Sequence, residues 1–149
     1  MSRIFITGST DGLGRWAAGV LIDEGHDVVL HSRTRARAAA VADLATRAAG
    51  AVIGDLSSAA ETRLLADQVN DIGRMDAVIH NAGIYLERSR DRTAEGHAKT
   101  LAVNTLAPYL LTALIDDMPP SEACWLRSAV RPRPPRDFDP GPVPSRSTR

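Results

Sequence analysis

The sequence has one cysteine, one lysine and no long apolar run. A lone Cys124 cannot form an internal disulfide, and a chain without disulfides suits a reducing compartment. No segment approaches the ~20 apolar residues that span a bilayer, and the start of the chain lacks the pattern of a secretion signal. A formal net charge of zero indicates no general attraction to nucleic acid or membranes. We therefore expect a cytoplasmic protein of one domain, with neither nucleic acid nor membrane as a partner.

A glycine-rich stretch is the most informative part of the chain. It reads Thr7-Gly8-Ser9-Thr10-Asp11-Gly12-Leu13-Gly14 and separates an apolar run from a helical pattern. Glycine lets a backbone approach a ligand closely, and the first N–H groups of a helix have no partner inside the helix. Together with the helix dipole, these groups form an anion site. The stretch therefore predicts a pyrophosphate site; the alternative is a tight turn without a ligand.

Short apolar runs alternate with helical patterns along the first half of the chain. The runs lie at Ile4–Ile6, Val28–Leu30, Ala51–Ile53 and Ala77–Ile79. Continuous apolar runs are typical of parallel strands that are covered on both faces. Helical patterns follow at about 12–24, after Thr34 and from Ser58 to Gly73. This order predicts an α/β fold: a doubly wound, Rossmann-like parallel sheet in three layers, with strand order 3-2-1-4.

The second half of the chain begins as a helix and then changes composition. A helical pattern runs from about Ala94 to Ile115 and contains Pro108, which leaves the carbonyl of Asn104 without its helical N–H partner. Residues 127–149 hold six of the 17 arginines and six of the nine prolines. We expect an incomplete domain over residues 1–120 and a disordered Arg/Pro-rich tail over residues 121–149.

The glycine-rich stretch resembles the cofactor motif of the short-chain dehydrogenase/reductase family. Three later elements match that family in order: Asp55-Leu56, then His80-Asn81-Ala82-Gly83 in place of Asn-Asn-Ala-Gly, then Asn104. The resemblance covers about residues 2–115. It implies an NAD(P)-binding domain of an oxidoreductase family, of which this chain keeps the N-terminal, cofactor-binding half.

Arg33 follows the second strand, where a dinucleotide fold faces the adenosine ribose. Arginine pairs with a 2′-phosphate, whereas an acidic residue accepts from a free 2′-hydroxyl, so NADP is favoured over NAD; the alternative is an ordinary surface arginine. The resemblance places the side chain of Asp55 at the adenine amino group, although spacing alone makes Asp55 equally a helix N-terminal acid. His80 is interpreted as a packed histidine. The predicted cofactor-binding residues are Thr7, Gly8, Ser9, Thr10, Asp11, Gly12, Leu13, Gly14, Arg33, Asp55, Leu56, Asn81, Ala82 and Gly83.

The family's catalytic residues have no counterpart at the expected place. The family uses a serine and a Tyr-x-x-x-Lys, whereas Tyr85, Tyr109 and Lys99 all lie upstream of that position. In the family, the free carbonyl of the helix asparagine holds a water of the proton relay. Asn104 is therefore the one relay residue left; the alternative is an incidental asparagine beside a proline. We expect the chain alone to be inactive, with a frameshift or deletion near Met118–Glu122.

Other classes of function stay open. One is a non-catalytic dinucleotide-binding or interaction module, and another is an inactive gene product. A nucleic-acid-binding tail ranks last, because only Phe138 interleaves its arginines. No metal site is expected, because the four histidines have no cysteine or carboxylate at ligand spacing. An unpaired sheet edge would favour a homo-oligomer or aggregation.

Overall fold

A computed structural model describes residues 1–85 and 91–115, where a parallel sheet forms the centre of the fold. Its strand order is β3-β2-β1-β4, which confirms the predicted α/β class and topology. The strands are β1 (Arg3–Ile6), β2 (Asp27–Ser32), β3 (Gly50–Ile53) and β4 (Ala77–Ile79). The predictions for residues 116–149, including the tail, lie outside the described residues.

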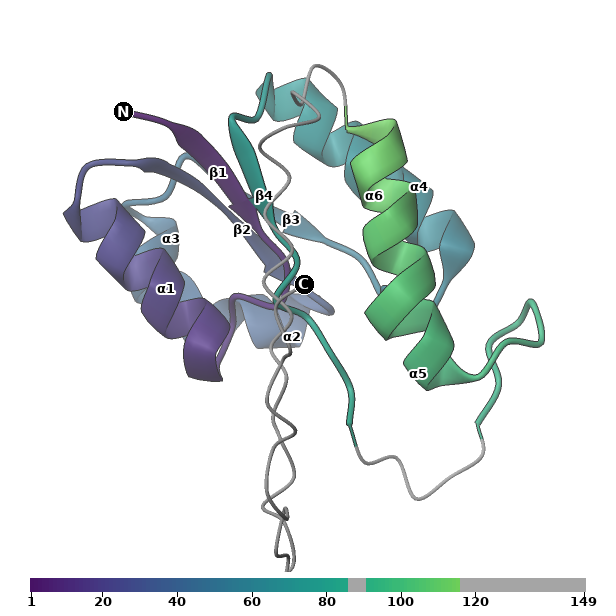
Figure 1. Cartoon of the computed structure of the whole chain (residues 1–149). Helices are drawn as coiled ribbons and strands as arrows, with labels where there is room; N and C mark the ends of the chain where they lie inside the picture. Colours follow the sequence, from purple (N-terminus) through teal and green to yellow (C-terminus); the bar gives the residue numbers. More distant parts are fainter. Residues whose placement is uncertain (86–90, 116–149) are drawn as a thin grey trace, which may run out of the picture.

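Helices cover both faces of this sheet, as predicted (Figure 1). One face carries α1 (Gly12–Asp23) and α3 (Ala42–Ala45), and the other carries α4 (Ala59–Ile72) and α6 (Ala107–Leu114). Two short helices, α2 (Arg35–Ala38) and α5 (Lys99–Leu101), lie near the carboxyl ends of the strands. None of the helices in the described ranges is long and apolar enough to cross a membrane.

Neighbouring residues of β1 supply two separate cores. Phe5 packs with the side chains of α4 and α6, and Ile6 packs with those of α1 and α3. Both side chains are fully buried, because successive residues of a strand point to opposite faces. Within the described residues, β3 and β4 are the edge strands. Association through such an edge stays a prediction.

The buried face of α1 differs from the face that the apolar pattern predicts. At helical spacing, the apolar residues Leu13, Ala17, Val20 and Leu21 of the sequence would share one face. The buried residues of the helix are instead Gly14, Ala18 and Ile22. Leu13 is 65% exposed. The face turns because Gly14 packs directly against the glycine-rich loop and the segment after β4. Backbone contact at one glycine thus decides which stripe of α1 meets the sheet.

The single helix predicted after Thr34 is wrong. The segment divides into α2, a 3₁₀ turn at Ala39–Val41 and α3. Thr34 caps α2, since its hydroxyl accepts a hydrogen bond from the Arg37 N–H at 3.3 Å. Val41 leaves helical torsions (φ −121°) and lies in the core beside Leu44. The break therefore allows two apolar side chains to enter the core from an otherwise exposed segment.

The last helix begins at Lys99 rather than at Ala94. Gly96 has φ +83° and closes a turn, in which its N–H donates to the Thr93 carbonyl. Residues 102–106 then form a π-helical turn directly before α6, so the backbone hydrogen bonds shift by one residue just ahead of Pro108. The free carbonyl at Asn104 stays a prediction.

Candidate functional site

Three glycines shape the loop between β1 and α1. Gly8 has φ +66°, and an added Cβ would lie 2.9 Å from the Ala82 Cα. A Cβ on Gly14 would overlap the Asn81 side chain and the Gly8 carbonyl oxygen. Gly12 also has a positive φ, of +53°, but nothing lies within 4 Å of an added Cβ. Gly8 and Gly14 therefore hold the loop against the protein, and Gly12 leaves its outer side open to a ligand.

Asn81 ties this loop to the segment after β4. Its side-chain amide donates to the Thr7 and Gly8 carbonyl oxygens, each at 3.0 Å. The Thr7 hydroxyl accepts from the Ala82 N–H at 3.0 Å, and the Thr7 N–H donates to the Ile79 carbonyl. The loop is therefore anchored to β4 by both backbone and side-chain bonds.

His31 holds the loop from the neighbouring strand β2, a contact that the sequence analysis did not predict. Its side chain is buried, and Nδ1 accepts from the Gly8 N–H at 2.9 Å. Nε2 lies 2.9 Å from the Gly54 carbonyl oxygen, beyond β3. Burial lowers the pKa of His31, and this effect outweighs the Gly54 hydrogen bond and the Asp55 charge, which raise it. The one signal in the sequence is a histidine directly after the apolar run Val28–Leu30, within the same strand.

A cavity of about 200 Å³ opens at the carboxyl end of the sheet, next to the loop. It brings together eight predicted residues: Gly8, Thr10, Asp11, Arg33, Asp55, Leu56, Ala82 and Gly83. Thr7 and Ser9 are buried, Gly14 and Asn81 hold the loop, and Gly12 and Leu13 are exposed. The cavity is also lined by residues that were not predicted: His31, Arg37, Ser57, Ile84, Lys99 and Val103.

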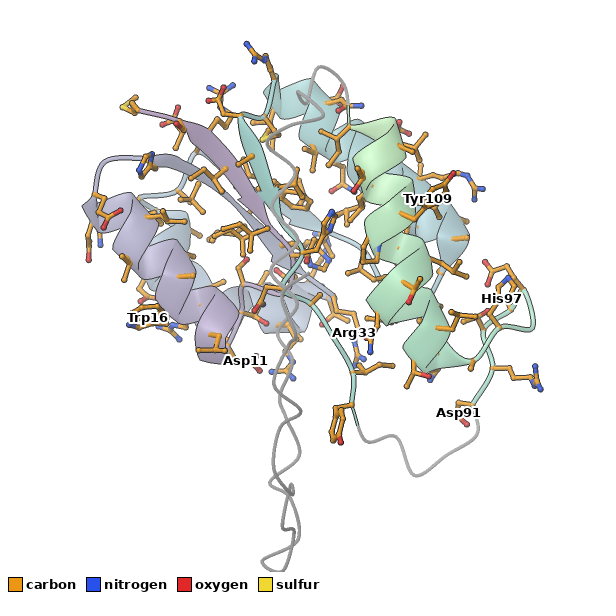
Figure 2. All side chains as sticks on the ribbon, viewed as in Figure 1. Asp11, Trp16, Arg33, Asp91, His97 and Tyr109 are labelled. Atoms are coloured by element: carbon orange, nitrogen blue, oxygen red, sulfur yellow. The ribbon has the colours of Figure 1, made fainter. Side chains whose placement is uncertain are left out.

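Three cations line this cavity, two from the segment after β2 and one from α5. Arg33 is exposed at the carboxyl end of the sheet (Figure 2). Arg37 pairs with Asp11 at 3.1 Å, and Lys99 pairs with Asp91 at 3.4 Å. Such solvent-exposed ion pairs contribute only ~0–1 kcal/mol each. Both partly exposed cations can therefore exchange their carboxylate partner for a ligand's anionic group at little cost.

Asp55 both shapes a turn and lines the cavity. One of its carboxylate oxygens accepts from the Ser57 N–H at 2.8 Å, and its own N–H donates to the Glu61 carboxylate at 2.8 Å. The adjacent Leu56 is buried and also faces the cavity. The alternative role as an acid of the helix start is not seen, because α4 begins at Ala59 after the cap Ser58 and its first-turn acid is Glu61. Asp55 lies ahead of the helix, in the turn that lines the cavity.

Asn104 connects the π-helical turn to Ile84, which lies in the segment after β4 and lines the cavity. Its Oδ1 accepts from the Ile84 N–H and its Nδ2 donates to the Ile84 carbonyl, both at 2.9 Å. The side chain therefore has a structural function and is not incidental to Pro108. The relay role of its backbone carbonyl stays a prediction.

His80 is a packed histidine, as the sequence analysis interprets it. It is 6% exposed, and Nε2 lies 3.0 Å from the Thr112 hydroxyl oxygen. That hydroxyl donates to the Pro108 carbonyl at 2.8 Å, so His80 Nε2 must be the donor to it. Burial lowers the pKa of His80 to about 4. In residues 1–85 and 91–115, no group of three or more His, Cys, Asp or Glu side chains could hold a metal ion.

Comparisons with known proteins match the part of the chain that forms this site. The family model for short chain dehydrogenases matches residues 2–122. An uncharacterized oxidoreductase of Emericella nidulans is 50% identical over 117 residues, which are 77% of this chain and 46% of that protein. The short-chain dehydrogenase chyC of Penicillium rubens is 47% identical over 116 residues, 78% of this chain and 45% of that protein.

A solved structure supports the same assignment of the fold. The short-chain dehydrogenase from Sphingobium yanoikuyae in complex with NADPH superposes with a TM-score of 0.62 at 28% identity. The match covers 77% of this chain and 47% of that one. The chain therefore spans about half the length of the proteins it matches.

Proposed function

Because the chain belongs to the short-chain dehydrogenase family, we propose that its cavity binds a nicotinamide dinucleotide and prefers NADP(H) to NAD(H). The observation that carries the proposal is the position of Arg33, in one cavity with the glycine-rich loop. The loop suits the pyrophosphate and Arg33 suits a 2′-phosphate. The proposed cofactor-binding residues are those predicted from the sequence, with Arg37 and Lys99 added.

The start of α1 supplies the pyrophosphate site in this proposal. Asp11 precedes the helix in an extended conformation, and its side chain makes no capping hydrogen bond. Its carboxylate pairs with Arg37 instead. The first N–H groups of the helix are thus not capped by a side chain, and Gly12 leaves space in front of them. Free N–H groups and the positive end of the helix dipole favour a phosphate there.

The charge of the cavity wall supports a preference for NADP(H). Arg33, Arg37 and Lys99 face Asp11 and Asp55, an excess of one positive charge. The two N–H groups of an arginine fork can bind two oxygens of one phosphate at once. A free ribose hydroxyl offers the arginine only one oxygen, and that oxygen carries no charge. The solved relative from Sphingobium yanoikuyae is a complex with NADPH, which is consistent with this choice.

Exchanging Arg33 for aspartate tests the proposal. We expect Arg33→Asp to weaken NADPH binding by about 10- to 100-fold, because charge-assisted hydrogen bonds contribute ~1.5–3 kcal/mol. NADH affinity should be kept or improved. Titration of the intact chain with each cofactor measures both constants. The matched control is Arg35→Asp, the same charge change at an exposed residue that does not line the cavity. An unchanged NADPH-to-NADH ratio in Arg33→Asp would remove Arg33 from the site.

Hydride transfer by this chain alone is expected to be negligible. Neither Tyr85 nor Tyr109 has a lysine four residues later, and general acid catalysis contributes ~10²–10⁴-fold to rate. An NADPH-oxidation assay over ketones, aldehydes and quinones measures this. Gly12→Trp is the control, since an indole there would fill the open side of the loop. Turnover well above that control would show that another residue of the chain acts as the general acid. It would also contradict the prediction that the chain binds the cofactor without catalysing hydride transfer.

A further inference from the structure

We propose that His31 is the positioning residue of the glycine-rich loop, and that its bond from the Gly8 N–H holds the loop in the form that receives the pyrophosphate. The ligand in this proposal rests on the proposed function. The geometry of the loop does not, so the two can be tested separately.

The hydrogen bonds of His31 define one tautomer. Nδ1 faces the Gly8 N–H, which only donates, and Nε2 faces the Gly54 carbonyl oxygen, which only accepts. The imidazole must therefore be neutral with its proton on Nε2. One ring joins the loop after β1 to the backbone after β3, and it does so from the strand that lies between them. Burial favours this neutral form.

Both backbone groups of Gly8 are held by side chains. His31 accepts from its N–H at 2.9 Å, and Asn81 donates to its carbonyl at 3.0 Å. Gly8 needs this support, because its φ of +66° is one of many conformations open to a glycine in an unsupported loop. With Gly8 fixed, the N–H groups at the start of α1 keep a constant direction toward the cavity.

Ser9 reinforces the same contact from the backbone of His31. The Ser9 hydroxyl accepts from the His31 N–H at 2.8 Å, and the Ser9 N–H donates to the His31 carbonyl at 3.2 Å. The imidazole and Phe5 rings also form a T-shaped pair, with the ring centres 6.4 Å apart. His31 is 3% exposed. Its ring therefore has little freedom to turn away from Gly8.

Three substitutions separate the two bonds of the ring. Asparagine places its Oδ1 where Nδ1 lies and can accept from Gly8, whereas glutamine places its Nε2 near the histidine Nε2 and can donate to Gly54. Leucine does neither. We expect His31→Asn to bind NADPH within about threefold of the wild type, and His31→Gln and His31→Leu to bind at least about tenfold more weakly. A fully buried N–H left without a partner costs ~1–3 kcal/mol. The Gly8 N–H is partly buried, so we expect a loss in the lower half of that range, about tenfold.

Hydrogen exchange in the ligand-free chain reports the loop directly. The Gly8 amide should stay protected in His31→Asn and exchange about tenfold faster or more in His31→Gln and His31→Leu. The amide of Val69, in the core of α4, reports global unfolding and normalises the comparison. Equal protection of Gly8 in all three variants would overturn the proposal. Rescue by glutamine rather than asparagine would also overturn it.

Cofactor titration of the wild type distinguishes the two claims. If the wild-type chain binds neither NADPH nor NADH, the proposed function fails. The exchange rates of the Gly8 amide in the three His31 variants then still decide whether His31 holds the loop. If the wild type binds NADPH and His31→Leu binds it equally well, the positioning role is wrong and the proposed function stands.

Discussion

Gly14→Ala is expected to lower the free energy of unfolding by about 3 kcal/mol or more and to abolish dinucleotide binding. An added methyl group would overlap the Gly8 carbonyl oxygen and the Asn81 amide. Overpacking of a buried site costs ~1–3 kcal/mol. Displacing Asn81 would also break its two bonds to the loop, at ~0.5–1.5 kcal/mol each.

A second glycine of the same helix is the matched control for this substitution. A Cβ on Gly19 would meet only the Leu44 side chain, at 3.9 Å, which is an ordinary contact. Alanine inside a helix is ~0.5–1 kcal/mol better than glycine. We therefore expect Gly19→Ala to be slightly stabilising, with cofactor affinity unchanged. Urea denaturation and cofactor titration of both variants measure the contrast. A Gly14→Ala chain as stable as the wild type would show that α1 can move away from the loop freely.

Acidification from pH 7.5 to pH 4 is expected to remove about 3 kcal/mol of stability through His80 alone. Burial lowers the pKa of His80 to about 4 in the folded chain, whereas an unfolded histidine has a pKa near ~6.5. Between these values the unfolded state binds more protons than the folded state. Stability is therefore full above pH 6.5 and is lost as the pH falls toward 4. His31, whose pKa is also lowered, adds to the loss in the same direction.

His80→Gln isolates this contribution. Glutamine keeps an N–H that can donate to the Thr112 hydroxyl, but it does not titrate. Urea denaturation at several pH values should give a wild-type curve that is steeper than that of the variant, with a difference of about 3 kcal/mol between pH 7.5 and pH 4. Parallel curves for the two proteins would mean that His80 stays solvated in the folded chain.

Local patterns were sufficient to predict the sheet and the loop. The apolar runs at β1 to β4 are continuous because each strand is buried on both faces, and that burial leaves its mark on neighbouring residues. The glycines of the loop and the caps Thr34 and Ser58 act within a few residues, so their effect is also visible in the sequence. The family resemblance follows from the same short motifs, and the match over residues 2–122 confirms it.

The errors of the sequence analysis have two causes, contacts with distant segments and a local turn. The break at Val41 and the start of the last helix at Lys99 depend on where the core and the Gly96 turn lie, which helical periodicity does not report. Lys99 enters the cavity from a segment more than 60 residues after Arg33. Sequence spacing alone could not bring these two cations together.

The sequence by itself determined the α/β class, the strand order and the place of the glycine-rich loop, because strand burial and glycine torsions act over short stretches of chain. Only the tertiary structure decided which face of α1 is buried, how Gly8 is held and which cations share the cavity. These features depend on contacts of the loop after β1 with the neighbouring strand β2 and with the segment after β4. His31 is the clearest case: its function consists of one hydrogen bond to a residue 23 positions earlier and one to a residue 23 positions later.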